Sequence, residues 1–342
     1  LIFMGEYMKY LVEITAYIIL VFLYIILSTS ILENNNISII FSIILLTILT
    51  LTTLKLNIKK VQNKIDKKIF TLINILLIFI VLLWSYVTKN IDNITQVVAN
   101  SYISNLEPSN YNSNFNIANY NDIKILYQDN ISEVIPLLKE LIDSSKYKCE
   151  KIFNNINVSF TIKLDYNQDV FLSRFGKESD NLSSYYIDST KTIYIYLNNS
   201  FDILNDKNSF STMLTHEISH YYFSEFLKEN DILPKNVPVW INEGIADYIS
   251  NRLYNLDYDC SEFIEFNKLS NSSDWLKIKS GKQYIQSYHS INKIVNMSNE
   301  SVITNLLLEL KDHNINEAFK NVTDMDFKKF ENTIKKNNIN SK

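Results

Sequence analysis

The first 88 residues contain three long apolar stretches, at roughly 10–32, 37–56 and 69–87. A helix needs ~20 apolar residues to cross a bilayer of about 30 Å, and each stretch is close to that length. The stretches have almost no polar face, which argues against buried core helices, and two of them follow the first, which argues against a cleaved signal peptide. We therefore predict three transmembrane helices within 1–88, with residues 10–88 in the lipid bilayer.

The placement of lysines predicts how these spans are oriented. Five lysines lie between the second and third stretches and Lys55 lies at the end of the second, whereas the turn at 33–36 between the first two carries none. Positively charged loops tend to stay in the cytoplasm. The N-terminus is therefore expected in the cytoplasm, and everything after Lys89 on the other side of the cell membrane.

The pattern of the remaining chain is polar and predicts an α+β domain. Residues 89–120 are rich in Asn, Ser and Tyr and are interpreted as an extracytoplasmic linker. Apolar and polar residues then alternate, as in strands, in three segments: 123–127, 158–164 and 193–197. Apolar residues recur at helical spacing from Ser132 to about Phe153, and again over most of the chain after Asn208. The domain is expected to span 121–342, with its strands before most of its helices.

Composition excludes some functions and leaves others open. The net charge is −4, and no basic stripe of the kind that binds nucleic acid is visible, so no nucleic-acid partner is expected. The chain has two cysteines, Cys149 and Cys260, far apart in sequence. They lack the short spacing of a zinc knuckle, and we expect free thiols rather than a disulfide.

The segment Thr215-His-Glu-Ile-Ser-His220 is a candidate metal site. Residues four apart on a helix share one face, so His216 and His220 can bind one metal ion. Glu217 lies beside the first of them, where a carboxylate can take a proton from a metal-bound water. The whole chain contains only four histidines, so a chance pairing around a glutamate is improbable.

A second segment, Trp240-Ile-Asn-Glu-Gly-Ile-Ala-Asp-Tyr248, supplies the third ligand. Pro238 suits the first turn of a helix, and Glu243 and Asp247 share a face of that helix, away from its apolar row. Glu243 is the predicted third ligand, and Asp247 is expected to accept a hydrogen bond from a ligand histidine. Two histidines and one glutamate leave an open position, which is typical of a catalytic Zn²⁺ rather than a structural one. We therefore expect one bound zinc ion.

These two segments resemble the zinc helices of the gluzincin metallopeptidases, the clan of thermolysin and aminopeptidase N, and most of all the small bacterial peptidase-MA-like domains. The resemblance covers roughly 121–335 and is strong only at the two helices. It implies a zinc-dependent peptidase with Glu217 as general base. It also implies a small mixed sheet above the histidine helix, whose edge strand binds an extended peptide or protein substrate. We place that edge strand at Thr192–Leu197.

The resemblance further implies a hydrogen-bond donor for the reaction's oxyanion on a later helix. Tyr284 and Tyr288 share a helix face there and are the candidates, Tyr284 first, while His289 points about 100° away. His289 and His313 are interpreted as surface residues.

The chain also departs from these relatives, and the departures bear on its activity. Glu243 follows His220 at a longer interval than in aminopeptidase N. The Gly-rich, Met-Glu-Asn motif by which aminopeptidases hold a free N-terminus is missing, which favours cleavage within a chain. The alternatives are an aminopeptidase of the same clan and a catalytically silent zinc-binding sensor or scaffold in the membrane. An intramembrane protease is disfavoured because the histidine motif lies far beyond the last apolar stretch.

Overall fold

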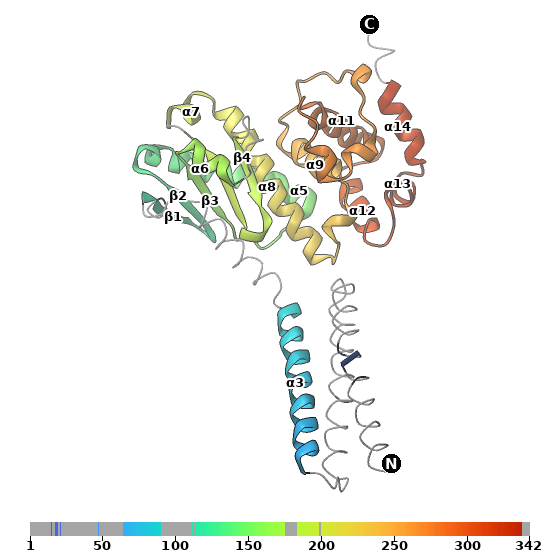
Figure 1. Cartoon of the computed structure of the whole chain (residues 1–342). Coiled ribbons are helices and arrows are strands. Elements are labelled where there is room, and N and C mark those ends of the chain that lie inside the picture. Colours follow the sequence, from blue (N-terminus) through green and yellow to red (C-terminus); the bar gives the residue numbers. More distant parts are fainter. Residues whose placement is uncertain are drawn as a thin grey trace. The chain divides into compact units, whose positions relative to one another are not determined.

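The computed structural model describes residues 64–89, 111, 114–174, 183–197 and 200–336, with a few isolated positions before residue 64 (Figure 1). The chain divides into two units, Leu1–Val97 and Val98–Lys342. In the first unit, helix α3 runs from Lys64 to Lys89 and covers the third predicted span. The first two predicted spans lie outside the described residues. Within the residues that are described, no helix combines the length and the apolar character needed to cross a membrane.

The second unit is an α+β domain that begins with a five-stranded mixed sheet. Its described strands are β1 (Asn116–Tyr120), β2 (Ile123–Tyr127), β3 (Thr161–Asp165), β4 (Ser184–Ile187) and β5 (Thr192–Tyr196). They lie in the order β1-β2-β3-β5-β4. Strands β2, β3 and β5 are parallel, and β1 and β4 pair antiparallel with the two outer members of that trio. The predicted strands at 123–127, 158–164 and 193–197 are confirmed, with β3 beginning slightly later than predicted.

Two strands were not expected, and they correct two predictions. Strand β1 lies within the predicted linker 89–120, and the polar sequence of this edge strand, with two Asn residues, does not alternate clearly. Strand β4 occupies the sheet edge, so the prediction that Thr192–Leu197 is an edge strand is wrong. The physical reason is burial: β5 lies between β3 and β4, and four successive residues of it, Thr192 to Ile195, are buried. A strand covered on both faces is an interior strand.

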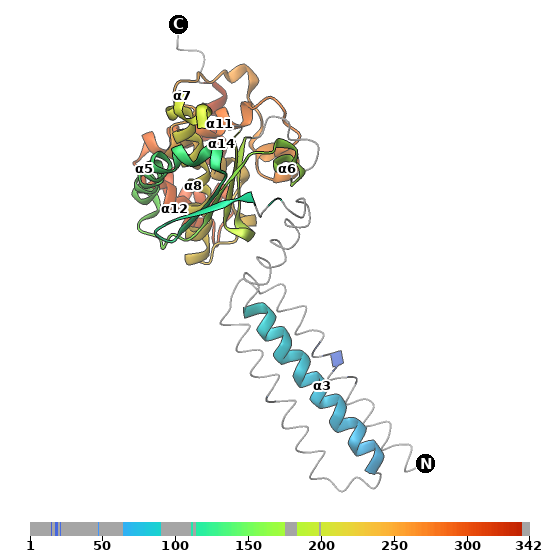
Figure 2. The same cartoon turned by 90° about the vertical axis from the view of Figure 1, so that its left-hand side faces the viewer.

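The rest of the second unit is mostly helical (Figure 1). Three helices lie between or directly after the strands in sequence: α5 (Ile135–Phe153), α6 (Gln168–Ser173) and α7 (Ser200–Asn205). The long helix α8 (Lys207–Glu229) follows, and then α9 (Val239–Ser250), α10 (Ser272–Trp275), α11 (Lys282–Met297), α12 (Ser301–Glu309), α13 (Ile315–Thr323) and α14 (Phe327–Lys336). Helix α8 lies next to the sheet, and α5 packs against α8 (Figure 1 and Figure 2). This agrees with the expectation of strands first and helices afterwards.

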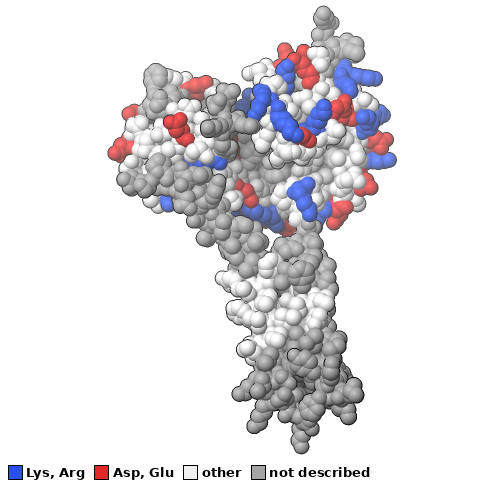
Figure 3. Space-filling model, in the orientation of Figure 1, with Lys and Arg blue, Asp and Glu red and all other residues white. Residues whose placement is uncertain are grey.

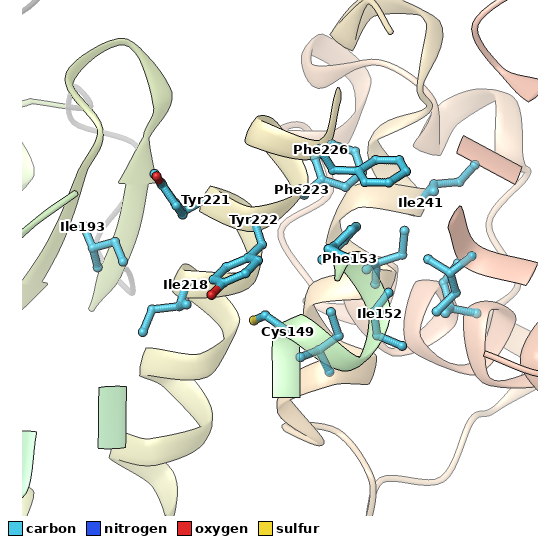
Figure 4. Packing of buried hydrophobic residues seen from close by; sticks show 14 of the residues in the cluster. Cys149, Ile152, Phe153, Ile193, Ile218, Tyr221, Tyr222, Phe223, Phe226 and Ile241 are labelled. Carbon is cyan, nitrogen blue, oxygen red and sulfur yellow. The ribbon is translucent and has the colours of Figure 1, made fainter. Parts of the chain in front are cut away.

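Helix α8 is the centre of the hydrophobic core. Its Ile218 is directed toward Ile193 of β5, while Phe223 and Phe226 lie near Phe153 of α5 and the side chain of Ile241 (Figure 4). The rings of Phe153 and Phe226 are 5.5 Å apart. A helix with large apolar residues on nearly all sides is a buried one. The sheet and the helical region therefore both fix the position of α8.

Small polar side chains join α8 to α5 in the interior. The hydroxyls of Ser145 and Thr215 are 2.8 Å apart, and the thiol of Cys149 lies 3.5 Å from the hydroxyl of Ser219. Cys149 is buried and forms no disulfide, as expected. Burial raises the pKa of its thiol to about 12, so the group stays protonated. Short side chains of this kind let two helices approach closely, which holds α8 in a fixed register on α5.

Acidic and basic side chains are interspersed over the visible face of the helical region (Figure 3). Several of them form ion pairs, such as Lys277 with Asp274 and Lys335 with Glu265. Exposed pairs of this kind contribute little to stability. The chemistry of interest lies instead between α8, α9 and the edge of the sheet.

Candidate metal centre

Helix α8 carries the two histidines one turn apart. The carboxylate of Asp206 caps its first turn by accepting a hydrogen bond from the backbone N–H of Ser209 at 3.0 Å, which fixes where the helix begins. His216 and His220 then project from the same face. His216 is buried, and His220 is largely buried. Both imidazoles are therefore held by a buried helix and not by a loop.

Helix α9 brings Glu243 to the same point. It begins directly after Pro238, and its Ile241, Ile245 and Ile249 are buried on the core side. Gly244 sets how closely α9 can pack on α11: a β-carbon there would lie 2.6 Å from the backbone oxygen of Ser287. Only a residue without a side chain fits, so the position of Glu243 depends on its neighbour Gly244.

The three predicted ligand atoms form a small triangle. The Nε2 atoms of His216 and His220 are 3.1 Å apart, and Oε2 of Glu243 lies 3.5 Å and 3.7 Å from them. Donors bound to one tetrahedral Zn²⁺ at the usual bond lengths are ~3.3 Å apart. This group could therefore hold a metal ion. Side chains from two separate helices, with Glu243 23 and 27 residues from the two histidines, converge as the sequence pattern predicted.

A second ring of contacts orients both imidazoles. Nδ1 of His216 lies 2.8 Å from Oδ1 of Asp247, and Nδ1 of His220 lies 3.0 Å from Oδ1 of Asn242. In each ring the Nε2 atom is thus the one left to face the centre. Asp247 lies beside the ring of His216, next to a ligand histidine as expected, whereas the contact of Asn242 with His220 was not predicted. The sequence feature that could have indicated Asn242 is its position directly before Glu243. That position places its side chain on α9 within reach of His220 on α8.

The electrostatics of the centre favour a cation. Burial and the charge of Arg252 lower the pKa of His216, but Asp247 and Glu243 outweigh both and raise it to about 9. Burial raises the pKa of Glu243, yet His220 and His216 outweigh it and lower that pKa to about 2. Glu243 at the Nε2 atoms and Asp247 at Nδ1 of His216 both stabilise positive charge on or beside that imidazole, whether it is a proton or a metal ion.

Glu217 stands beside this group and faces a cleft. The side chain is buried, and its Oε1 accepts a hydrogen bond from the hydroxyl of Ser184 at 2.7 Å. Ser184 is the first residue of the edge strand β4. The cleft has a volume of about 630 Å³, and its lining includes β4, Glu217 and the three metal-ligand candidates. Glu217 therefore borders both the metal centre and the space that a substrate could enter.

The two tyrosines proposed as oxyanion donors lie on α11 in different surroundings. Tyr284 lines the cleft, and its ring packs edge-on against Trp275 with the centroids 5.0 Å apart. Burial and the nearby charge of Glu243 raise the pKa of its phenol, so the hydroxyl keeps its proton. Tyr288 is buried and is not among the residues that line the cleft. Of the two, Tyr284 is the one with access to the cleft.

The two remaining histidines lie away from this group. His289 has one ring nitrogen 2.9 Å from the backbone oxygen of Leu256. The ring nitrogens of His313 lie 3.8 Å and 3.9 Å from the carboxylates of Glu309 and Glu317. Neither histidine belongs to the metal-ligand group found among the described residues.

Comparison with known proteins gives a distant relative. No family model matches the chain. The uncharacterized protein YhcO of Bacillus subtilis (strain 168) is 27% identical to it over 131 residues, which are 37% of this chain and 41% of that protein. The chain thus matches about two fifths of the length of this relative. The two are distant homologues. The group of His216, His220 and Glu243 in this chain is consistent with a metal site of the gluzincin type.

Proposed function

We propose that the protein is a zinc-dependent peptidase. The observation that carries this proposal is the triangle of His216, His220 and Glu243 donors, with the carboxylate of Glu217 beside it on the wall of a cleft. Two nitrogens and one carboxylate oxygen are donors that suit Zn²⁺, and three protein ligands leave a position open for water or substrate. When bound there, Zn²⁺ would lower the pKa of a water molecule toward ~7 and polarise a carbonyl group.

The residues around the centre have distinct roles in this proposal. Glu217 accepts a proton from the attacking water and passes it to the leaving amine. The hydrogen bond from Ser184 fixes the orientation of that carboxylate. Tyr284 keeps its phenolic proton and can donate a hydrogen bond to an oxyanion formed in the cleft. These are the groups that hydrolysis of a peptide bond requires.

The substrate is expected to lie along β4, not along β5. Among the described strands, β4 pairs only with β5 and forms an edge of the described sheet, and an extended peptide can add to an edge strand as a further strand. Ser184 of this strand already contacts Glu217. A peptide added to this edge would therefore run past the catalytic carboxylate. The proposed strand is thus β4 in place of the segment Thr192–Leu197 named from the sequence, and the peptide still binds as an added strand.

The proposal predicts that peptide cleavage depends on the metal. We expect the purified full chain to bind one zinc per molecule and to cleave members of an unbiased peptide library. Chelation should abolish cleavage, and added Zn²⁺ should restore it, because the open coordination site disappears with the ion. The measurement is mass spectrometry of the products, with zinc content determined in the same samples.

The same library separates the two kinds of peptidase. If peptides with blocked N-termini are cleaved as well as free ones, the enzyme is an endopeptidase, as we propose; if blocking stops all cleavage, it is an aminopeptidase. A protein that binds zinc but cleaves no member of the library would contradict the enzymatic proposal and favour a sensor or scaffold.

We also propose that residues 1–88 attach the protein to a cell membrane with residues 121–342 outside the cytoplasm. The support is the apolar composition of that region, together with the aliphatic and aromatic side chains that α3 exposes, such as Leu72, Ile75 and Phe79. Fractionation of cells expressing the full chain should leave it in the membrane pellet after a carbonate wash. Protease added to intact spheroplasts should then degrade residues 121–342. Recovery in the soluble fraction would contradict the attachment.

A further inference from the structure

Arg252 is a charged residue in the cleft that the peptidase mechanism above does not use. It follows the last turn of α9, and its side chain lines the cleft together with Leu253 and Leu256. The other charged residues of the described lining are acids or histidines, among them Asp188, Glu217 and Glu243. Within that lining, Arg252 is the single Lys or Arg side chain. A negatively charged group that enters the cleft therefore has one side chain of fixed positive charge to meet.

Two contacts hold the guanidinium of Arg252 in place. Its Nε atom lies 2.7 Å from Oδ1 of Asp247, the same oxygen that lies 2.8 Å from the ring of His216. Its central carbon lies 5.4 Å from the centroid of the Tyr284 ring. These contacts fix the position of the group relative to the metal ligands on one side and to the proposed oxyanion donor on the other. Little side-chain entropy remains to be lost when a ligand binds.

The contacts to the protein use only part of the guanidinium. An arginine has five N–H donors, and the ion pair with Asp247 uses the Nε side. No partner for the two terminal nitrogens is found among the described residues, and about a third of the side chain, 32%, is exposed. If the only role of Arg252 were to support Asp247, its side chain would not need to line an accessible cleft. The planar pair of nitrogens is the group that binds a carboxylate through two parallel hydrogen bonds.

We propose that Arg252 is a specificity residue that binds a carboxylate of the peptide substrate, so that peptides carrying this charge near the scissile bond are preferred. This proposal rests on the proposed function of the site. The carboxylate can be the free C-terminus of the peptide or the side chain of Asp or Glu. Both have the same geometry and charge, and paired peptides distinguish them.

The first test uses cleavage by the zinc-loaded full chain. Peptides are compared in pairs that differ only in Glu against Gln at one position around the cleaved bond, or in a C-terminal acid against a C-terminal amide. We expect the acid member of at least one pair to have a kcat/KM higher by about tenfold or more, the range for a hydrogen-bonded ion pair. Arg252→Gln should bring that ratio close to one, mainly through KM, and Arg252→Lys should retain part of it.

The second test measures binding and does not require turnover. Acetyl-Ala-Phe with a free carboxylate, its amide, and acetyl-Ala-Glu-amide are titrated into zinc-loaded Glu217→Gln protein. The same three peptides are titrated into the Glu217→Gln, Arg252→Gln double variant. A carboxylate can also bind the metal ion, and that contribution is common to both proteins, so the difference between them isolates Arg252. We expect the preference for an acid over the amide to fall about tenfold when Arg252 is replaced. Zinc content of both proteins is the control.

The outcomes separate this proposal from the proposed function. If peptides are cleaved but acid and amide members react alike, or if the preference survives in Arg252→Gln, the role of Arg252 is overturned while the peptidase remains. If nothing is cleaved, the peptidase proposal fails, and the binding titration still decides whether Arg252 recognises a carboxylate. In that titration, equal affinity for the acid and the amide in both proteins would also overturn the role of Arg252.

Discussion

Replacing Glu217 with Gln is expected to reduce kcat for peptide cleavage by about 10²–10⁴-fold, the usual contribution of a general acid–base group. The amide has nearly the same shape and can still accept the hydrogen bond from Ser184, but it cannot take up a proton from water. Because Glu217 is not one of the three metal-ligand candidates, zinc should remain at one ion per chain. Steady-state cleavage of one library substrate and zinc analysis of the same preparation check both parts.

Glu225→Gln is the matched control. Glu225 lies on the same helix, where its carboxylate pairs with Lys191 and Lys228 at the surface and not with the metal centre. The same chemical change there should leave kcat within about twofold, because surface ion pairs contribute little. If Glu217→Gln keeps more than a tenth of the wild-type kcat, Glu217 is not the general base, and the mechanism proposed above is wrong.

Replacing Gly244 with Ala is expected to lower the free energy of unfolding by about 1–3 kcal/mol, the typical cost of overpacking a core. The new methyl group would lie 2.6 Å from the backbone oxygen of Ser287 and 2.7 Å from the side chain of Ile291, both on α11. Helix propensity alone predicts the opposite sign, a gain of about 0.5–1 kcal/mol for Gly→Ala within a helix. Equilibrium urea denaturation of the wild type and the variant decides between the two signs.

The same variant should also weaken zinc binding, because α9 must move and Glu243 moves with it. Gly281→Ala is the comparison: it has a left-handed backbone with φ of +73°, yet no atom lies within 4 Å of its would-be β-carbon. That change should cost about 1–2 kcal/mol from the backbone alone and leave zinc affinity unchanged. If Gly244→Ala proves as stable as the wild type and binds zinc as tightly, close packing of α9 on α11 does not fix the ligand.

The metal centre could be predicted from the sequence because its geometry is local. The four-residue spacing of His216 and His220 places two imidazoles on one helix face whatever the rest of the fold does. Glu243 and Asp247 share a face of their own helix for the same reason. The sequence could not give the distance between the two helices, which depends on packing such as that at Gly244. The structure supplies that distance and brings all three ligand atoms together.

The parts of the site that were missed depend on tertiary contacts. Asn242 reaches His220, and Ser184 reaches Glu217, from residues 22 and 33 positions away in sequence. Strand order could not be read from the pattern either, because the short strand β4 and the longer β5 both contain tyrosine and isoleucine. The assignment of the edge to β5 failed for that reason. A polar strand such as β1 resembles a linker when its pairing with β2 is not known.

The measurement that tests the central claim most directly is anomalous diffraction at the zinc absorption edge from crystals of the zinc-loaded protein. We predict one strong peak per chain, about 2.0–2.2 Å from Nε2 of His216, Nε2 of His220 and a carboxylate oxygen of Glu243. A peak at any other group of side chains, or no peak in protein that binds zinc in solution, would contradict the account.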